Sequence, residues 1–459
     1  MKSKISFRFL LALYISKVLQ MIIKLIYKNK GTHLPGTYAI KICPDFLSRI
    51  GRPDIVIAVT GTNGKTSVCH FINTIFISNG ITTVNNTKGS NMPAGIASCL
   101  IEVSNLLGKV KEEVAIIEVD ERASGFVYDH IPPTYLVCTN LFRDSIKRNG
   151  HSEFILTKIK SSVPPTTTLI LNADDLISST IGSDTNKKIY FGVSKVLDIK
   201  QTNNIVHDIN VCPLCKNKLN FNYYHYHHIG KAFCSKCHFQ SPEADFVVND
   251  IDLKNNFFTL SEKGKKIKYK LISDSIFNIY NMASSIAVAR TFGLSHNQIK
   301  LAFESLELKE DRQKKDVIDT KEIITMLSKN QNPISCSRMF DYVSSQPGNK
   351  VIVLYITDSI DKIHGSEDIS WLYDTDFEYL NNKEIKQIIA CGTRCYDVAL
   401  RLKLAGIDEQ IIVTNNDYEG VEKMILGDNV DKIYILYELY AYPLALKLKK
   451  KISEGGLNK

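Results

Sequence analysis

The 459-residue sequence contains no internal repeat and no low-complexity tract, which excludes a repeat architecture. It also lacks a small-residue cleavage site after its apolar N-terminal segment, so that segment does not resemble a secretory signal. The eleven cysteines are an odd number, which would leave an unpaired thiol in a secreted protein. We therefore expect a cytoplasmic protein whose cysteines stay reduced.

The chain is long and apolar enough for more than one hydrophobic core. A single core rarely serves 459 residues, and 44% of the residues are hydrophobic. We therefore predict two or three globular domains. The formal net charge of +9 suits nucleic acid, anionic lipid or phosphorylated ligands, and charge alone does not choose among them.

The N-terminal segment combines a long apolar run with spaced lysines. Residues 7–27 are strongly apolar, yet they include Lys17 and Lys24, and Lys28 follows directly. Spacings of seven and four place these lysines on one face of a helix. A membrane-spanning helix would bury Lys17 near its middle, which is costly. We therefore predict that residues 1–50 are an amphipathic helix and lead-in, lying either on the inner face of the cell membrane or on the protein's own core.

Residues 54–67 predict a buried strand that leads into a phosphate-binding loop. Residues 55–59 are apolar and mostly β-branched, as in a parallel strand covered on both faces. The glycines and lysine that follow offer backbone N–H groups and a cation to phosphates, and a threonine hydroxyl can bind Mg²⁺. Val59 replaces the first glycine of the common phosphate-loop pattern, so the loop is a variant. The predicted nucleotide contacts are Gly61, Thr62, Asn63, Gly64, Lys65, Thr66 and Ser67, with Thr66 also a magnesium ligand.

Polar residues also stand at the ends of later strands in the same predicted sheet. One predicted strand ends in Glu118, and the next is followed by Asn140. In an open parallel sheet, the ligand crevice lies outside the carboxyl ends of the strands. We therefore expect Glu118 and Asn140 to converge on Lys65, with Glu118 as a second magnesium ligand. Asp120 and Glu121 are expected to form a solvated acidic cluster.

An insertion at residues 205–245 carries two Cys-x-x-Cys pairs with eighteen residues between them. This spacing is typical of a zinc ribbon, in which four thiolates surround Zn²⁺ and leave no position for a catalytic water. Two redox pairs or four unrelated thiols are the alternatives. Nearby histidines are expected to be exposed neighbours rather than ligands, namely His225, His227, His228 and His238. The predicted zinc ligands are Cys212, Cys215, Cys234 and Cys237.

A charged linker leads into a second α/β domain, predicted at residues 311–459. Apolar, β-branched runs alternate there with helical patterns, which indicates a doubly wound sheet. Cys391 and Cys395 are expected to be buried structural thiols. The predicted fold class is thus α/β, with a central doubly wound parallel sheet at residues 51–310, the zinc-ribbon insertion, and a separate C-terminal α/β domain.

The sequence Thr-Gly-Thr-Asn-Gly-Lys-Thr at residues 60–66 resembles the ATP loop of the Mur ligase family, whose members join amino acids or amines to carboxylates through acyl phosphates. The resemblance implies a Mur ligase-like central domain that uses ATP and Mg²⁺. It implies that Asn172 and Asp174 hold the nucleotide and that Asn281 approaches the adenine. Arg312 matches the family's domain-junction arginine, although aspartate replaces the glycine that usually precedes it. Together with the loop lysine, this arginine would offset charge in phosphate transfer.

Residues 364–378 and 391–407 look like the C-terminal domain of the MurT family, the ligase subunits of lipid II isoglutaminyl synthases. This resemblance implies ATP-dependent amidation of the α-carboxylate of D-glutamate in the lipid II stem peptide, with ammonia from a GatD-type glutamine amidotransferase partner. It further implies that Asp368 completes the partner's Cys-His triad, with Asp374 as the second candidate. Trp371, the only tryptophan, and Tyr373 would then anchor the partner.

Two other functions fit parts of the sequence. A stand-alone Mur-type ligase acting on a soluble amino acid would need the same loop but no glutaminase. A nucleic-acid-dependent ATPase would need a basic ribbon surface, yet the stretch after the second cysteine pair carries Glu243, Asp245, Asp250 and Asp252. We therefore expect no nucleic-acid partner.

Overall fold

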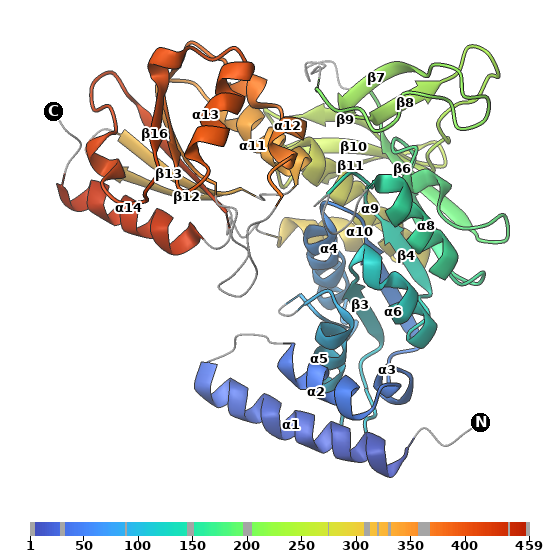
Figure 1. Cartoon of the computed structure of the whole chain (residues 1–459). Coiled ribbons are helices and arrows are strands. Elements are labelled where there is room, and N and C mark those ends of the chain that lie inside the picture. The colour runs from blue at the N-terminus through green and yellow to red at the C-terminus, as the bar shows by residue number, and fades with distance from the viewer. Residues whose placement is uncertain are drawn as a thin grey trace. The chain divides into compact units, whose positions relative to one another are not determined.

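Figure 1 shows the computed structural model, which describes residues 5–27, 33–87, 90–144, 151–195, 204–273, 275–306, 313–318, 321–328, 332–356, 368–438 and 441–455. The chain divides into two compact units. The first comprises Met1–Phe142, Ser152–Thr202 and Asp208–Leu308, and the second comprises Arg143–His151, Asn203–His207 and Lys309–Lys459. Each unit contains its own sheet and its own hydrophobic core.

The first unit is built on a nine-stranded sheet whose central strands run parallel. The strand β1 (Ile55–Thr60) is buried almost throughout, as its apolar run predicted. Thr60 pairs with Cys138, and Val59 pairs with Glu118, so three neighbouring strands end at one edge of the sheet. The strand order is β11 (Lys265–Lys270), β10 (Phe257–Glu262), β9 (Phe246–Asp252), β6 (Lys188–Val193), β5 (Thr168–Asn172), β4 (Tyr135–Cys138), β1, β3 (Val114–Glu118) and β2 (Thr83–Asn85).

Helices cover both faces of this sheet, which is why its central strands are apolar on both sides. On one face, Val56 and Ala58 share a hydrophobic core with α1 (Phe7–Tyr27), α2 (Leu34–Ile42), α3 (Phe46–Arg49), α5 (Pro93–Val103), α6 (Ser124–His130) and α8 (Ser152–Ser162). Outside that core, three other helices pack together: α4 (Lys65–Ser78), α9 (Ile276–Phe292) and α10 (His296–Glu304). The doubly wound arrangement predicted for this part of the chain is confirmed.

The cysteine-bearing insertion lies between β6 and β9 and forms a separate two-stranded sheet. Its strands β7 (Asn220–Tyr226) and β8 (Ile229–Phe233) are antiparallel. Besides its cysteines, the small core at this point has only Leu176, Leu219 and Ala232 as fully buried members. A metal bound by the cysteines would crosslink this small core and add to its stability.

The second unit contains a six-stranded sheet with a hydrophobic core on each face. The strand order is β12 (Gln313–Ile318), β13 (Lys321–Leu327), β17 (Lys432–Tyr437), β14 (Lys350–Tyr355), β15 (Ile385–Cys391) and β16 (Ile412–Asn415), and only the β12–β13 pair is antiparallel. Its helices are α11 (Pro333–Ser345), α12 (Trp371–Asp374), α13 (Cys395–Leu404) and α14 (Tyr442–Gly455). Cys391 and Cys395 are buried, as predicted, and burial raises the pKa of both thiols.

Among the described residues, α1 is the one helix long and apolar enough to cross a membrane. That result rests on length and composition over Phe7–Ile26, and a core helix or a signal sequence passes the same test. In this structure α1 packs through Phe9, Ala12 and Leu13 onto the core of the first unit. One of the two predicted settings of the helix, contact with the protein's own core, is therefore present.

Candidate functional site

The phosphate loop lies between the end of β1 and the start of α4, where its two glycines adopt left-handed backbone conformations. Gly61 has φ 122° and Gly64 has φ 89°. A Cβ atom on Gly64 would stand 2.3 Å from Asn281 Oδ1 on α9, and one on Gly61 would stand 2.3 Å from Thr139 Oγ1. Backbone conformation and close packing therefore both require glycine at these positions.

The end of β4 holds the loop in shape. The Asn63 N–H donates to Asn140 Oδ1 at 3.0 Å, and the Thr62 N–H donates to the Asn140 carbonyl at 2.8 Å. Thr139 Oγ1 donates to the Asn63 carbonyl at 2.6 Å. Asn140 is buried, so its side chain fixes the loop rather than facing open solvent. Asn140 was predicted from its position after a strand to approach the loop, and the structure places it there.

The two predicted magnesium ligands meet at the start of α4. Thr66 Oγ1 donates a hydrogen bond to Glu118 Oε2 at 2.8 Å, and Asn91 Nδ2 donates to the other carboxylate oxygen at 3.4 Å. Thr66 is exposed, so a ligand can reach this pair from solvent. A hydroxyl and a carboxylate beside a phosphate loop are the oxygen ligands that Mg²⁺ takes in nucleotide sites. These residues therefore fit Mg²⁺.

Lys65 forms an ion pair that the sequence did not reveal. Its Nζ lies 2.8 Å from Glu121 Oε1 and also donates to the Gly61 carbonyl. The side chains of Lys65 and Glu121 are only 12% and 7% exposed. The expectation that Glu121 is solvated is wrong, because the short 3₁₀ turn after β3 (Glu121–Ala123) directs this carboxylate to the loop lysine. Asp120 pairs with Arg122 at 3.1 Å instead.

Asn172 and Asp174 lie in the protein interior at the end of β5. Asn172 Nδ2 donates to the Thr139 carbonyl at 3.2 Å, which joins β5 to β4. Asp174 Oδ2 accepts hydrogen bonds from the Val193 N–H and the Tyr280 hydroxyl, both at 2.8 Å. Burial raises the pKa of Asp174. Both side chains thus connect the strands and α9 behind the loop, and their contact with a nucleotide stays a prediction.

Asn281 approaches the loop from α9. Its Oδ1 stands next to Gly64, and its Nδ2 donates to Asn278 Oδ1 at 3.3 Å. The residue is almost fully buried. Asn281 therefore lies against the phosphate loop, although its position on a helix far along the chain gave no geometric reason to expect this.

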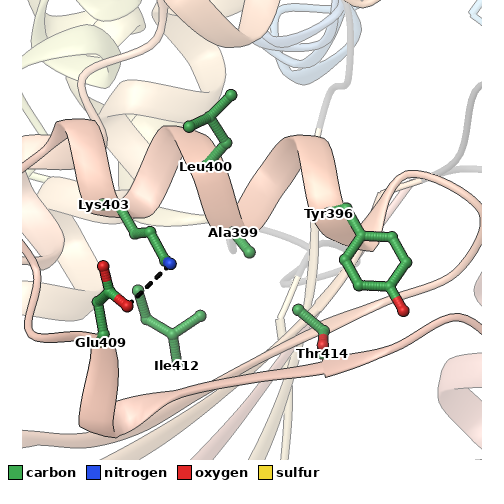
Figure 2. A pocket seen from close by; sticks show the side chains of 7 residues that line it. All are labelled: Tyr396, Ala399, Leu400, Lys403, Glu409, Ile412 and Thr414. Atoms are coloured by element: carbon green, nitrogen blue, oxygen red, sulfur yellow. Dashed lines mark ion pairs between the residues drawn. The ribbon is translucent and has the colours of Figure 1, made fainter.

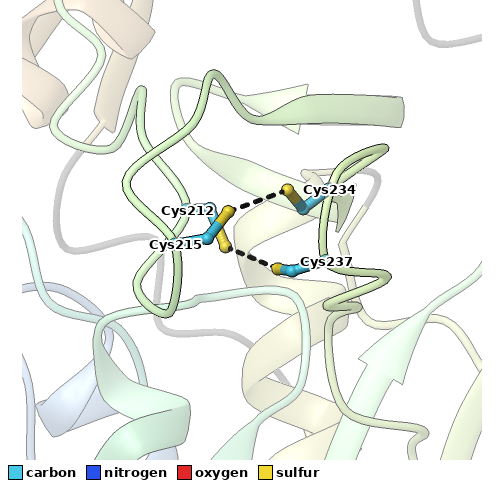
Figure 3. A group of neighbouring side chains, drawn as sticks. All are labelled: Cys212, Cys215, Cys234 and Cys237. Atoms are coloured by element: carbon cyan, nitrogen blue, oxygen red, sulfur yellow. Dashed lines mark hydrogen bonds between the residues drawn. The ribbon is translucent and has the colours of Figure 1, made fainter.

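The four predicted zinc ligands gather in one group, as Figure 3 shows. Their sulfur atoms all lie within 4.8 Å of one another, and Cys212–Cys237 and Cys215–Cys234 are each 3.5 Å apart. Four thiolates bound at ~2.3 Å to a tetrahedral Zn²⁺ stand about 3.8 Å apart. The cluster therefore fits a closed tetrahedral zinc site, as the spacing predicted.

The histidines near this cluster differ from expectation. His238 is exposed as predicted, but His225, His227 and His228 are buried. His228 Nε2 lies 3.2 Å from Asp175 Oδ1, and His225 Nε2 lies 3.1 Å from the Val193 carbonyl. The prediction that these three are exposed is wrong, because the β7–β8 hairpin folds back onto the ends of β5 and β6.

In the second unit, the two candidate triad carboxylates have different surroundings. Asp368 is exposed, and its Oδ1 accepts a hydrogen bond from the Ser370 N–H at 2.7 Å. Asp374 pairs with Arg143 at 3.2 Å. Trp371 is buried in the unit's own core, so the expectation that it anchors a partner is wrong. Tyr373 is exposed, and its role as an anchor stays a prediction. Arg312 lies outside the described residues.

A surface pocket of the second unit lies between α13 and the edge strand β16, as Figure 2 shows. Its lining includes an ion pair of 2.9 Å between Lys403 and Glu409. The other lining residues are Tyr396, Ala399, Leu400, Ile412 and Thr414. The pocket carries none of the predicted site residues, and the phosphate loop belongs to the other unit.

Two protein families match the chain. The Mur ligase middle domain matches residues 59–289, and the MurT ligase C-terminal family matches residues 327–441. Both matches cover the segments whose motifs carried the sequence resemblance.

Curated relatives match over most of the chain. The chain is 31% identical, over 86% of its length and 88% of the relative's, to "Lipid II isoglutaminyl synthase (glutamine-hydrolyzing) subunit MurT" of Staphylococcus aureus. It is 28% identical to the protein of the same name from Streptococcus pneumoniae, over 89% of this chain and 90% of the relative.

Solved structures of ligases share the fold at lower identity. A pseudomurein peptide ligase type C from Methanothermus fervidus has a TM-score of 0.66 at 19% identity, over 89% of this chain and 81% of that one. MurF from Acinetobacter baumannii has a TM-score of 0.61 at 16% identity, over 90% of this chain and 80% of that one. These likenesses show a Mur ligase-like fold.

Proposed function

Because this chain belongs to the MurT family of Mur ligase-like proteins, we propose that it is the ligase subunit of a lipid II isoglutaminyl synthase. Its substrate is the α-carboxylate of D-glutamate in the lipid II stem peptide. A carboxylate oxygen attacks the γ-phosphorus of ATP, and ADP leaves. Ammonia then attacks the acyl phosphate carbonyl, phosphate leaves, and the nitrogen loses a proton to give D-isoglutamine.

The phosphate loop is the observation that carries this proposal. Two left-handed glycines and the Asn140 contacts fix the shape of the loop, and Lys65 lies at its base. We assign the backbone and side chains of residues 61–67 to the ATP phosphates, with Arg312 as a second cation. When bound by Thr66 and Glu118, Mg²⁺ would offset the negative charge of the phosphates. Asn172, Asp174 and Asn281 complete the proposed nucleotide site.

The nitrogen donor is assigned to a partner. A GatD-type glutamine amidotransferase would hydrolyse glutamine and release ammonia to this chain. Asp368 is the favoured carboxylate for the partner's Cys-His pair, because it is exposed, whereas the Asp374 side chain is only 20% exposed. The relatives are named as subunits of a glutamine-hydrolysing enzyme, which supports a two-chain assembly.

Three further assignments complete the proposal. Residues 51–310 are the ATP-binding domain, residues 311–459 are the MurT-type C-terminal domain, and residues 1–50 are the N-terminal amphipathic helix and lead-in. The Cys₄ cluster holds a structural Zn²⁺, because four protein thiolates leave no open position for substrate. The protein works in the cytoplasm, where the carboxylate of a lipid-linked precursor and ATP are both accessible.

The deciding experiment is a mass measurement of lipid II incubated with this chain, a GatD-type partner, ATP, Mg²⁺ and glutamine. We expect the mass change of one carboxylate converted to a carboxamide, and fragmentation should place it on the D-glutamate α-carboxylate. The same reaction with Lys65→Ala should leave lipid II unchanged. Unmodified lipid II with the wild-type pair, together with ATP turnover on a soluble amino acid, would favour the stand-alone ligase instead.

A further inference from the structure

Both lysines of α1 bond to the neighbouring helix α5. Lys17 Nζ donates hydrogen bonds to the carbonyls of Ile101 at 2.7 Å and Ser104 at 2.5 Å, at the C-terminal end of α5. These carbonyls lack helical partners and lie at the negative end of the helix dipole, so a cation is favourable there. Lys24 pairs with Glu102 of the same helix at 2.8 Å. The Lys17 contacts therefore attach α1 to α5, and the half-exposed pair of Lys24 lies beside them.

Away from its contacts with α2 and α5, α1 presents an apolar face to solvent. Figure 1 shows the helix at the outer end of the first unit, beyond α2 and α5. Nine apolar or aromatic side chains recur on it at helical spacing and are 41% to 83% exposed. They are Phe7, Leu11, Tyr14, Ile15, Val18, Met21, Ile22, Leu25 and Ile26, here called the α1 outer face. A continuous apolar surface of this kind on a folded unit marks a contact site.

The sequence around the α1 outer face has charge of only one sign. Residues 1–44 contain seven lysines and one arginine and no aspartate or glutamate, and the first acidic residue is Asp45. This segment therefore carries a formal charge of +8, out of +9 for the whole chain. The positive charge of the sequence segment that carries this apolar face complements an anionic lipid headgroup layer.

We propose that the α1 outer face docks into the interface of an anionic lipid bilayer, with the helix parallel to the membrane plane. A spanning orientation would require α1 to leave α2 and α5 and would carry Lys17 and Lys24 into hydrocarbon. The in-plane orientation keeps every contact described above and removes the nine side chains from water. Membrane contact would bring the first unit to a lipid-linked substrate, and that use rests on the proposed function. The membrane contact itself does not depend on the proposed function.

The test is co-sedimentation of the full chain with vesicles of phosphatidylglycerol and phosphatidylcholine, without lipid II. We expect the wild-type chain to sediment with anionic vesicles and to be released as salt rises, because headgroup attraction is screened. The double variant Val18→Asp/Ile22→Asp should lose at least tenfold in vesicle partitioning. Its folding is checked by thermal unfolding, since both side chains are exposed in the native state.

A matched control places the same charges on exposed apolar residues elsewhere in the first unit. Ile77 and Leu301 are 56% and 65% exposed, so Ile77→Asp/Leu301→Asp adds the same charge without touching the α1 outer face. We expect this variant to bind vesicles as the wild type does. Equal losses in both double variants would overturn the proposal, as would a wild-type chain that stays in the supernatant.

Two further outcomes are informative. If the wild-type chain is a dimer in solution and Val18→Asp/Ile22→Asp is a monomer, a second copy covers the face and the lipid proposal fails.

Amidation of detergent-solubilised lipid II separates this proposal from the proposed function. The α1 variant should amidate normally there, whereas vesicle binding without amidation in detergent by the wild-type pair would reject the function and leave the membrane surface standing.

Discussion

At the scale of single residues, Lys65 and Glu121 form a nearly buried ion pair at the base of the phosphate loop. Removing one partner of such a pair leaves the other as an uncompensated charge. A substitution at Lys65 therefore has two separate effects. It removes a cation from the phosphates, and it leaves the Glu121 carboxylate without its ion-pair partner.

Lys65→Ala should lower ATP-dependent amidation by at least ~10²-fold, because a preorganised charge next to the transferred phosphoryl group is lost. It should also lower the free energy of unfolding by roughly 1–3 kcal/mol, because the buried Glu121 carboxylate loses its partner. Product mass and urea unfolding measure the two effects.

The matched control is Lys65→Ala/Glu121→Gln, which also removes the negative charge of Glu121. We expect this double variant to regain most of the lost stability while remaining inactive. A single variant as stable as the wild type would contradict the buried pair, and near-normal amidation by a folded Lys65→Ala chain would reject the role of the lysine.

Asp368→Asn should abolish glutamine-driven amidation while leaving partner binding and part of the reaction with free ammonia. The expected loss is roughly 10⁴-fold, as for other triads whose carboxylate becomes an amide and no longer fixes the histidine tautomer. Amidation with glutamine and with ammonium chloride, measured side by side, gives the comparison.

Asp374→Asn is the control for that position. It breaks an ion pair with Arg143 whose side chains are partly exposed, so its stability effect should be within ~1 kcal/mol. We expect full glutamine-driven activity. An inactive Asp374→Asn chain beside an active Asp368→Asn chain would transfer the role to Asp374, and full activity in both would remove the shared triad.

At the scale of elements, the loop that joins β1 to α4 depends on the left-handed Gly64 and its contact with α9. Gly64→Ala should destabilise the chain by more than the ~1–2 kcal/mol of a left-handed alanine, because its Cβ would also meet Asn281. We further expect the shift in unfolding temperature caused by Mg²⁺ and nucleotide to disappear.

Gly80→Ala is the control that separates the cost of the left-handed backbone from the contact with Asn281. Gly80 has a similar φ of 77°, but no atom lies within 4 Å of an added Cβ. This variant should show only the backbone cost and should keep the nucleotide-induced shift. Equal nucleotide responses in the two alanine variants would contradict the assignment of this loop to phosphate binding.

The folded structure of the β7–β8 insertion should depend on bound metal. The chain should purify with about one tetrahedral Zn²⁺, and Cys212→Ser should increase hydrogen exchange in the hairpin while leaving the second unit unchanged. His238→Ala is the control, since this exposed neighbour of Cys237 should not alter the zinc content. Freshly purified, reduced protein without zinc would reject the site.

At the scale of the whole molecule, the two proposed tasks lie in different units. The phosphate loop belongs to the first, and Asp368 belongs to the second. Lys65→Ala in complex with the partner should therefore still release glutamate from glutamine, at least in part, while making no amidated product. Complete loss of glutamine hydrolysis in this variant would show that the two tasks do not separate by unit.

The sequence by itself determined the features whose chemistry is contiguous or evenly spaced. Residues 55–66 identified both the buried strand and the loop. Runs of β-branched apolar residues favour a buried strand, and the glycines that follow permit the left-handed backbone of the loop. The two Cys-x-x-Cys pairs identified the thiolate cluster because their spacing suits one metal. The rule that ligands bind at strand ends correctly brought Glu118 and Asn140 to the loop.

The tertiary structure alone decided which side of each element faces the protein. Glu121 resembles any surface acid in sequence, and only the turn after β3 brings it to Lys65. Lys17 and Trp371 are further cases, since the lysine finds carbonyls at the end of α5 and the tryptophan turns into its own core. Periodicity fixes which residues share a face, but burial depends on what packs against that face, and those partners come from distant parts of the chain.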